Sequence, residues 1–265
     1  MDDKIAIIGC GNIGGAIAKG LVRSGSATPG QLTVTRRQTD QLAHFASEGY
    51  NITSDNSAAI QSAEIVILTV QPQQVMEILD VAADALTAGK MVLSVVSGMT
   101  IADLSAKLGS GLPVVRAMPN IAIEIGESIT CLAARVQDSS ALALAAKLFG
   151  GMGATLEIDE ELMVPATALG ACGVAFFLRC IRAMSQGGIE IGFHPEEALQ
   201  IAAQAARGAA SLMLQMEGHP ESAIDRVTTP RGATISGLNK MEHEGLSSAI
   251  IKGIIASADK LGKLV

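Results

Sequence analysis

The feature that most constrains this chain is a glycine-rich loop near its start, which reads Gly9-Cys10-Gly11-Asn12-Ile13-Gly14. An apolar run of strand length, residues 4–8, precedes the loop, and residues 13–22 follow it with apolar side chains at helical spacing. Strand, G-x-G-x-x-G and helix in this order predict a dinucleotide-binding unit. The first glycine permits a tight turn, the second lets the backbone approach a pyrophosphate, and the third lets helix and strand pack closely. The alternative is a glycine-rich turn that binds nothing.

The end of the second predicted strand, residues 31–35, bears on which nicotinamide dinucleotide is preferred. An NAD-preferring site has an Asp or Glu there, hydrogen bonded to the ribose 2′-hydroxyl, but no acid occurs in residues 27–39. Thr35, Arg36 and Arg37 stand where a 2′-phosphate would lie, and a guanidinium suits phosphate geometry. The sequence therefore predicts NADPH as cofactor, with NADH possible but less favoured. The alternative is that both arginines are only solvated charges.

Strand-like and helical segments alternate through the first part of the chain, which predicts an α/β fold with a Rossmann-type, doubly wound parallel sheet. Further strands are expected at 51–53, 64–70, 91–96, 113–117, 128–133 and, at the edge, 155–158. Beyond residue 159 no convincing strand is found, and glycines and prolines divide helical segments. We therefore expect a nucleotide-binding domain over residues 1–158 and an all-α domain over residues 159–265.

Ligands of such sheets bind beyond the carboxyl ends of the strands. Three predicted strand ends should therefore face the cofactor, although each is also compatible with an ordinary loop. They are Val70-Gln71-Pro72, Ser97-Gly98 and Met118-Pro119-Asn120.

Composition limits the partners and the compartment. A net charge of -7 and an aromatic content of 2% disfavour nucleic acid. The four cysteines show no C-x-x-C pair and no histidine at ligand spacing, which predicts reduced thiols, no metal site and a cytoplasmic protein. The start of the chain lacks a basic region. The longest apolar stretch, residues 164–178, is shorter than a bilayer span, so we expect a buried helix and no membrane segment.

Two features of the second part suggest further contacts. The helix expected at 195–216 is rich in alanine, which suits either a subunit interface or a helix packed within one chain. A turn at 228–233 opens another helix, where free N–H groups of Gly232, Ala233 and Thr234 would cradle a carboxylate. The alternative is an ordinary helix N-cap at Thr234.

With these motifs in place, the chain resembles the pyrroline-5-carboxylate reductase family. The resemblance runs over about residues 4–260 and rests on the glycine loop with its asparagine and on two further motifs. These are Arg116-Ala117-Met118-Pro119-Asn120 and Thr229-Pro230-Arg231-Gly232-Ala233-Thr234. The sequence departs from the family pattern at four places: Gln71 replaces a lysine, Arg231 replaces a glycine, Ile121-Ala122 replaces Thr-Pro, and Gly170-Ala171-Cys172-Gly173-Val174 replaces Ser-Gly-Ser-Gly-Pro at a helix start.

The resemblance implies reduction of 1-pyrroline-5-carboxylate to L-proline by hydride transfer from NADPH, in a homodimer or a larger oligomer such as a ring of dimers. Thr234 is then the catalytic residue, hydrogen bonded to the ring nitrogen. Substrate-binding residues are Thr229, Gly232, Ala233 and Glu160, the last as a carboxylate near the iminium charge. Cofactor-binding residues are Gly9, Gly11, Asn12, Ile13, Gly14, Thr35, Arg36, Arg37, Asn56, Val70, Gln71, Pro72, Ser97 and Asn120.

Two other functions are compatible with a glycine loop and a helical second part. A 3-hydroxyacid dehydrogenase would use a helix lysine as proton donor, and no lysine occurs between Lys147 and Lys240. A non-catalytic dinucleotide sensor would bind NADPH without oxidising it.

Overall fold

The computed structural model describes residues 3–109 and 111–263. Its contacts divide the chain into two compact units. The first unit contains the residues through Cys172 together with those from Ser257 onward, and the second is Gly173–Ala256. The domain boundary between residues 158 and 159 stays a prediction, because compactness within one chain does not define an independently folding domain.

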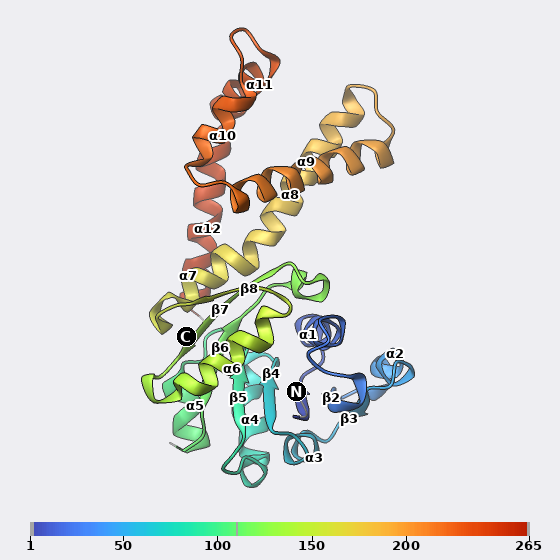
Figure 1. Ribbon diagram of the computed structural model, residues 1–265, viewed down its shortest axis with the longest axis vertical. Coiled ribbons are helices and arrows are strands. Elements are labelled where there is room, and N and C mark those ends of the chain that lie inside the picture. Colours follow the sequence, from blue (N-terminus) through green and yellow to red (C-terminus); the bar gives the residue numbers. More distant parts are fainter. Residues whose placement is uncertain (1–2, 110, 264–265) are drawn as a thin grey trace. The chain divides into compact units, whose positions relative to one another are not determined.

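The first unit is built on an eight-stranded sheet in the order β3-β2-β1-β4-β5-β6-β7-β8 (Figure 1). Its strands are β1 (Ile5–Ile8), β2 (Leu32–Thr35), β3 (Asn51–Thr53), β4 (Ile65–Leu68), β5 (Met91–Ser94), β6 (Val114–Met118), β7 (Ser128–Ala134) and β8 (Gly153–Glu157). The Rossmann-type, doubly wound sheet predicted from the sequence is confirmed, and β8 is the expected edge strand.

The direction of the last two strands was not predicted. Strands β6 and β7 are antiparallel, whereas β7 and β8 are parallel, so both run opposite to the first six. The reason is the short connection, which consists of little more than the 3₁₀ helix η4 (Ile121–Ile125). A parallel pair needs a crossover of about a dozen residues or more, which this segment cannot supply.

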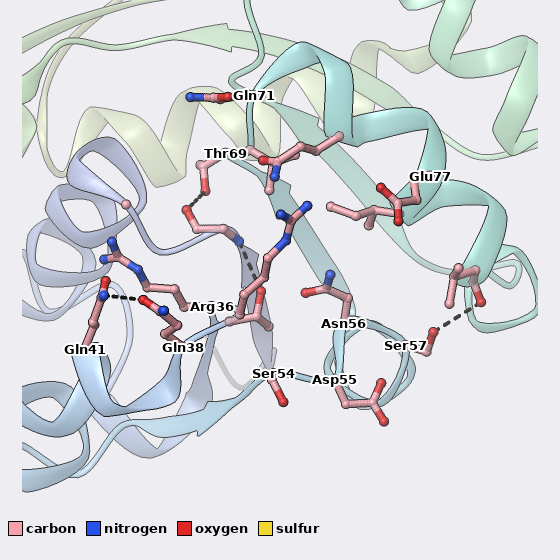
Figure 2. A pocket seen from close by; sticks show the side chains of 18 residues that line it. Arg36, Gln38, Gln41, Ser54, Asp55, Asn56, Ser57, Thr69, Gln71 and Glu77 are labelled. Atoms are coloured by element: carbon pink, nitrogen blue, oxygen red, sulfur yellow. Dashed lines mark hydrogen bonds between the residues drawn. The ribbon is translucent and has the colours of Figure 1, made fainter.

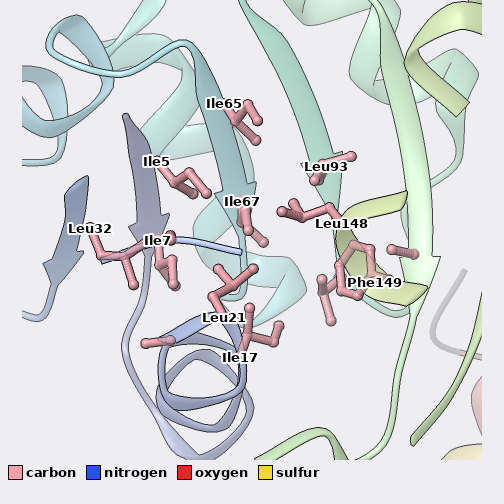
Figure 3. Packing of buried hydrophobic residues seen from close by; sticks show 14 of the residues in the cluster. Ile5, Ile7, Ile17, Leu21, Leu32, Ile65, Ile67, Leu93, Leu148 and Phe149 are labelled. Carbon is pink, nitrogen blue, oxygen red and sulfur yellow. The ribbon is translucent and has the colours of Figure 1, made fainter. Parts of the chain in front are cut away.

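Alternating side chains divide the core between the two faces of the sheet. Ile5 and Ile7 of β1 join the cluster that also contains Leu21 and Phe149 (Figure 3). Ala6 and Ile8 of the same strand belong to the cluster on the other face. Fully burying one such large aliphatic side chain contributes about 1.5–3 kcal/mol. The sheet is therefore packed on both faces, as a parallel sheet requires.

Helices of the first unit cover these two faces. Residues of α1, α2 and α6 contribute to the cluster that contains Ile5 and Ile7, and residues of α3, α4 and α5 contribute to the other. Their bounds are α1 (Asn12–Arg23), α2 (Ala43–Ser47), α3 (Asn56–Gln61), α4 (Pro72–Val81), α5 (Ile101–Leu108) and α6 (Ser139–Gly150). Pro72 occupies the first turn of α4, and Thr100 with Asp103 forms a capping box at α5.

The chain continues as α7 (Met163–Ala166), a π-helical segment η7 (Thr167–Ala171), and α8 (Cys172–Glu190). It then forms α9 (Pro195–Gln215), α10 (Pro220–Val227), α11 (Ala233–His243) and α12 (Leu246–Gly262). Helix α10 was not predicted, although His219 caps it and Pro220 occupies its first turn. Helix α9 is the helix expected at 195–216 and ends one residue earlier.

The expectation of a short buried helix at 164–178 is wrong. The helical run covers residues 160–190, and by length and composition alone it is apolar enough to cross a membrane. Only 17% of its most apolar window is buried, and Phe177 is 72% exposed. The sequence pattern detected apolar residues correctly, but this single chain does not cover them.

Candidate active site

The glycine loop connects β1 to α1 at the carboxyl edge of the sheet. Gly9 has φ +97°, and a Cβ there would collide with Val70. A Cβ at Gly14 would lie 2.7 Å from the carbonyl oxygen of Gly9. At Gly11, by contrast, no atom of the described residues lies within 4 Å of the Cβ position. The three glycines thus provide a turn, an open approach and a close helix contact, in the order that a dinucleotide loop requires.

The start of α1 is free to meet an anion. Gly11 is its N-cap, no described side chain caps the helix, and its first turn contains no acid. First-turn N–H groups have no partner within a helix, and they carry the positive end of the helix dipole. The backbone at Asn12, Ile13 and Gly14 can therefore receive a phosphate.

A cavity of about 770 Å³ lies beside this loop, within the size range of cofactor sites. Figure 2 shows Arg36, Gln38 and Gln41 on one side of it and Asn56, Ser57 and Glu77 on the other. The predicted cofactor residues that line it are Gly9, Gly11, Thr35, Arg36, Arg37, Asn56, Val70 and Gln71. Residues from the ends of β1, β2 and β4 are therefore brought together, as predicted.

The two arginines differ in their contacts. Arg36 donates from Nη1 to the carbonyl oxygen of Cys10, 3.2 Å away, which fixes its side chain against the glycine loop. Arg37 is exposed, and no hydrogen bond from its side chain is found among the described residues. Two acids, Asp55 and Glu77, also line the cavity, but Asp55 caps α3 by accepting from the N–H of Ala58. The positive charge therefore gathers at the end of β2, where a 2′-phosphate would lie.

Cys10 lies inside the loop but is not a nucleophile. Its side chain is 2% exposed. Burial raises the pKa of the Cys10 thiol to about 11, and Arg36 only partly offsets this effect. The residue is therefore a neutral thiol at physiological pH.

Other predicted cofactor residues lie outside this cavity. Asn12 lines a neighbouring cavity of about 350 Å³ together with Gly11 and Arg36. Ile13, Gly14, Pro72, Ser97 and Asn120 line neither cavity. Ser97 and Asn120 nevertheless follow β5 and β6 at the same edge of the sheet.

The Asn120 side chain is engaged within the protein. Its Oδ1 accepts from the N–H of Ala122, and its Nδ2 donates to the carbonyl oxygen of Gly170 in the π-helical segment, 3.1 Å away. The residue is only 6% exposed. A contact between Asn120 and a cofactor stays a prediction, and the hydrogen bonds present assign its side chain to holding η7.

Glu160 is likewise engaged. Its Oε1 accepts from the backbone N–H of Ile101 at 2.7 Å and from Nη1 of Arg116 at 3.2 Å. A direct contact between this carboxylate and a substrate therefore stays a prediction.

The second predicted anion site lies in the second unit, at the start of α11. The N–H of Gly232 donates to the carbonyl oxygen of Thr229 at 2.8 Å, and Arg231 between them has φ 62°. A Cβ at Gly232 would lie 2.6 Å from the Thr229 hydroxyl. The N–H of Gly232 is thus used inside a tight turn, and the backbone of Ala233 and Thr234 remains to bind an anion.

Thr234 is not the N-cap of its helix, so that alternative is wrong. Gly232 is the N-cap, no described side chain caps α11, and Thr234 lies in the first turn. Thr229, Ala233 and Thr234 are exposed. The hydroxyl of Thr234 is therefore free to contact a ligand bound at the helix start.

The sequence interpretation missed two polar residues that shape this edge of the sheet. Thr69 lines the larger cavity, and its hydroxyl contacts the backbone of the glycine loop. A threonine after a strand gives no distinctive signal. Arg116 lies in β6, where every residue is buried. Here a signal was present, because a lone charge within an apolar strand needs a partner.

Comparisons with known proteins agree with these features. Residues 160–264 match a family model described as pyrroline-5-carboxylate reductase dimerisation, and residues 4–98 match one described as NADP oxidoreductase, coenzyme F420-dependent. The chain is 47% identical to pyrroline-5-carboxylate reductase 2 of Dictyostelium discoideum, covering 98% of this chain and 92% of that protein.

Two further relatives extend the comparison. Pyrroline-5-carboxylate reductase 1 of the same organism is also 47% identical over 99% of this chain, which spans half the length of that relative. The crystal structure of Plasmodium falciparum pyrroline carboxylate reductase with NADP bound has a TM-score of 0.89 at 21% identity. It covers 99% of this chain and 98% of its own, which shows a shared fold.

Proposed function

This chain belongs to the pyrroline-5-carboxylate reductase family, and we propose that it reduces 1-pyrroline-5-carboxylate to L-proline with NADPH, the last step of proline biosynthesis. The observation that carries the proposal is the cavity of about 770 Å³ that joins the glycine loop to Arg36 and Arg37. It combines a backbone site for a pyrophosphate with two guanidinium groups for a 2′-phosphate.

When bound, NADPH supplies the hydride that reduces the imine carbon. The chain itself has three tasks, which are to bind the dinucleotide, to orient the imine and to exclude water. The open approach at Gly11 and the uncapped start of α1 serve the first task. The hydrogen bond from Arg36 to the carbonyl oxygen of Cys10 already restricts the arginine side chain, so less conformational entropy is lost when the dinucleotide binds.

The substrate end of the reaction is assigned to the start of α11. The N–H groups of Ala233 and Thr234 would hold the substrate carboxylate; the position of both residues in the uncapped first turn of α11 and the close approach of Thr229 to Gly232 support this assignment. The Thr234 hydroxyl would hydrogen bond to the ring nitrogen of a protonated imine, which already accepts hydride. The protein therefore needs no strong general acid for this reduction.

The chain forms a homo-oligomer, in agreement with the dimerisation model that matches residues 160–264. Large apolar side chains of its helices are exposed in the single chain, among them Phe177, Leu178 and Ile251. Exposed apolar surface of this kind marks an interaction site. We propose a dimer, with a ring of dimers as the larger form, that covers these residues and removes water from the reaction.

The remaining assignments follow from composition. We propose a soluble cytoplasmic enzyme that acts on a small molecule and contacts neither nucleic acid nor membrane. The support is the net charge of -7 and the absence of disulfides among the described residues, whose four cysteines are all free. The apolar run at 160–190 is then explained by subunit contact rather than by a bilayer.

The test is a direct assay. Purified protein is mixed with NADPH and 1-pyrroline-5-carboxylate, and we expect loss of the nicotinamide absorbance together with formation of L-proline. Binding of NADPH without any oxidation that depends on the imine would contradict the proposal and favour a dinucleotide sensor.

A further inference from the structure

Arg116 is a charged side chain inside a buried strand. All five residues of β6 are buried, and Arg116 is 5% exposed. Its Nη1 donates to Oε1 of Glu160 at 3.2 Å, and its Nε has no hydrogen-bond partner among the described residues. Removing a guanidinium from water is strongly unfavourable unless it is paired. Apolar residues would fill this place in the strand at lower energetic cost, so the arginine calls for a functional explanation.

The Glu160 carboxylate links three elements. The oxygen that receives Arg116 also accepts from the backbone N–H of Ile101 at 2.7 Å, and Ile101 is the first residue of α5. Glu160 itself begins the helical run of residues 160–190. One carboxylate oxygen therefore joins β6, the start of α5 and the start of that run, all within the first unit.

These elements meet at the carboxyl edge of the sheet. Residues 95–100 connect β5 to α5, and 97–100 are the last part of this loop, so the hydrogen bond at Ile101 fixes the end of the loop. The other partner of Glu160, Arg116, lies in β6, which ends at Met118, two residues before Asn120. Two of the strand ends that we expect to face the cofactor, Ser97-Gly98 and Met118-Pro119-Asn120, thus lie within four residues of Ile101 or Arg116, which the Glu160 carboxylate joins.

We propose that Arg116 and Glu160 form a pair of positioning residues that fixes the loop of residues 97–100 for hydride transfer. The inference rests on the proposed reductase function. Glu160 then acts through Arg116 and Ile101 rather than by touching the substrate. The pair is a support for the nicotinamide end of the site, whereas the phosphates are held at the glycine loop and Arg36, away from the pair.

The test is a double-mutant cycle with Arg116→Met, Glu160→Gln and the double variant. Each single variant should lower kcat at least about tenfold through misplacement of the reacting groups, while the dissociation constant of NADPH changes less than about threefold. The double variant should be no slower than the worse single variant, because both residues act as one unit. Arg116→Lys, which keeps the charge, should recover part of kcat and serves if Arg116→Met does not fold.

A matched control lies at the opposite edge of the sheet. Arg135 and Asp138 form another ion pair at 2.7 Å, in which Asp138 is buried and Arg135 is half-buried, and Arg135 also donates to the carbonyl oxygen of Leu112, just before β6. Asp138→Asn should lower the melting temperature as Glu160→Gln does but leave kcat within about twofold of the wild type. Equal losses of kcat in Asp138→Asn and Glu160→Gln would mean that the Arg116–Glu160 pair contributes only to stability, which would overturn the proposal.

Two other outcomes also overturn it. Multiplying losses in the double variant would mean that Glu160 acts independently of Arg116, as a direct substrate contact would. An unchanged kcat in both single variants would remove any role in catalysis.

Failure of the proposed reductase function can be distinguished from failure of the positioning role. If the wild type does not oxidise NADPH with the cyclic imine, the proposed function fails, and the fluorescence of bound NADPH then tests the pair. Glu160→Gln and Arg116→Met should change this emission, which reports the surroundings of the reduced nicotinamide, and Asp138→Asn should not. Identical emission in all variants contradicts the positioning role.

Discussion

The hydroxyl of Thr69, just after β4, donates to the carbonyl oxygen of Gly9 at 2.9 Å and thereby ties the first glycine of the loop to the neighbouring strand. It also donates to the carbonyl oxygen of Ile8 at 3.0 Å. The same hydroxyl is one of the two atoms that leave no space for a side chain at Gly14. The conformation of the glycine loop therefore depends on hydrogen bonds from Thr69 as well as on the glycines of the loop itself.

Replacing Thr69 with valine removes this donor at almost constant volume. We expect a loss of about 1 kcal/mol in the free energy of unfolding and roughly tenfold weaker binding of NADPH, because the loop loses its fixed shape. Titration of the fluorescence of NADPH measures the binding. Thr69→Ser keeps the hydroxyl and should bind NADPH like the wild type, so equal weakening in both variants would refute the hydrogen-bond explanation.

Much of the first unit was predictable because its signals are local. Strand β1 is a continuous apolar run, and few other loops require glycines at the spacing of Gly9, Gly11 and Gly14. Thr100 and Asp103 have the spacing of a capping box, which indicates the start of α5. The direction of β7 was not predictable from its residues. It depends on the length of the connection after Asn120, which matters only once β6 and β7 are known to be neighbours.

The features that could not be predicted depend on contacts between residues distant in sequence or on contacts with another subunit. The apolar pattern of residues 164–178 predicted burial, but it carries no information on whether this chain or another subunit provides the cover. Likewise, Asn120 and Glu160 were identified as polar residues near a strand end. Their partners Gly170 and Arg116 lie 50 and 44 residues away in sequence, so the sequence alone did not reveal how these side chains are used.

Replacement of Arg37 with alanine tests the cofactor preference. Arg37 makes no side-chain hydrogen bond within the described residues, so its loss should weaken NADPH roughly ten- to hundredfold through the 2′-phosphate and leave NADH almost unchanged. Arg36→Ala should also weaken NADPH more than NADH, with a small loss for NADH because the contact with Cys10 disappears. Dissociation constants for both cofactors decide the question, and equal losses in Arg37→Ala would dismiss the phosphate site.

Thr234→Ala tests the proposed catalytic residue. Loss of a hydrogen bond to a charged ring nitrogen should raise the barrier by about 1.5–3 kcal/mol, which is roughly ten- to hundredfold in kcat/KM. Ser236→Ala is a suitable control, since this hydroxyl lies in the same helix and donates to the carbonyl oxygen of Gly232. Steady-state rates with the cyclic imine measure both variants, and wild-type turnover in Thr234→Ala would exclude the role.

Arg231→Gly tests the strain in the turn before α11. Arg231 is the one non-glycine residue with positive φ in the described part of the chain. A left-handed conformation is unfavourable by about 1–2 kcal/mol for such a residue, and the greater flexibility of glycine in the unfolded chain offsets about half of this. We expect a net gain of up to about 1 kcal/mol in urea denaturation. Arg207→Gly, within α9, should instead lose about 1 kcal/mol. Destabilisation by both changes would show that the Arg231 side chain makes a stabilising contribution larger than the strain.

Cys10 should make the stability of the protein fall at alkaline pH. Burial raises the pKa of its thiol from 9.0 to about 11, with Arg36 opposing the change. Between these values the unfolded chain releases a proton that the folded chain retains. The contribution of Cys10 to the free energy of unfolding is thus complete below pH 9.0 and is lost as the pH rises toward about 11. A shift of this size corresponds to about 2–3 kcal/mol. Urea denaturation at both ends of this range should show a smaller alkaline loss for Cys10→Ala than for the wild type, and parallel losses would mean that the thiol ionises equally in both states.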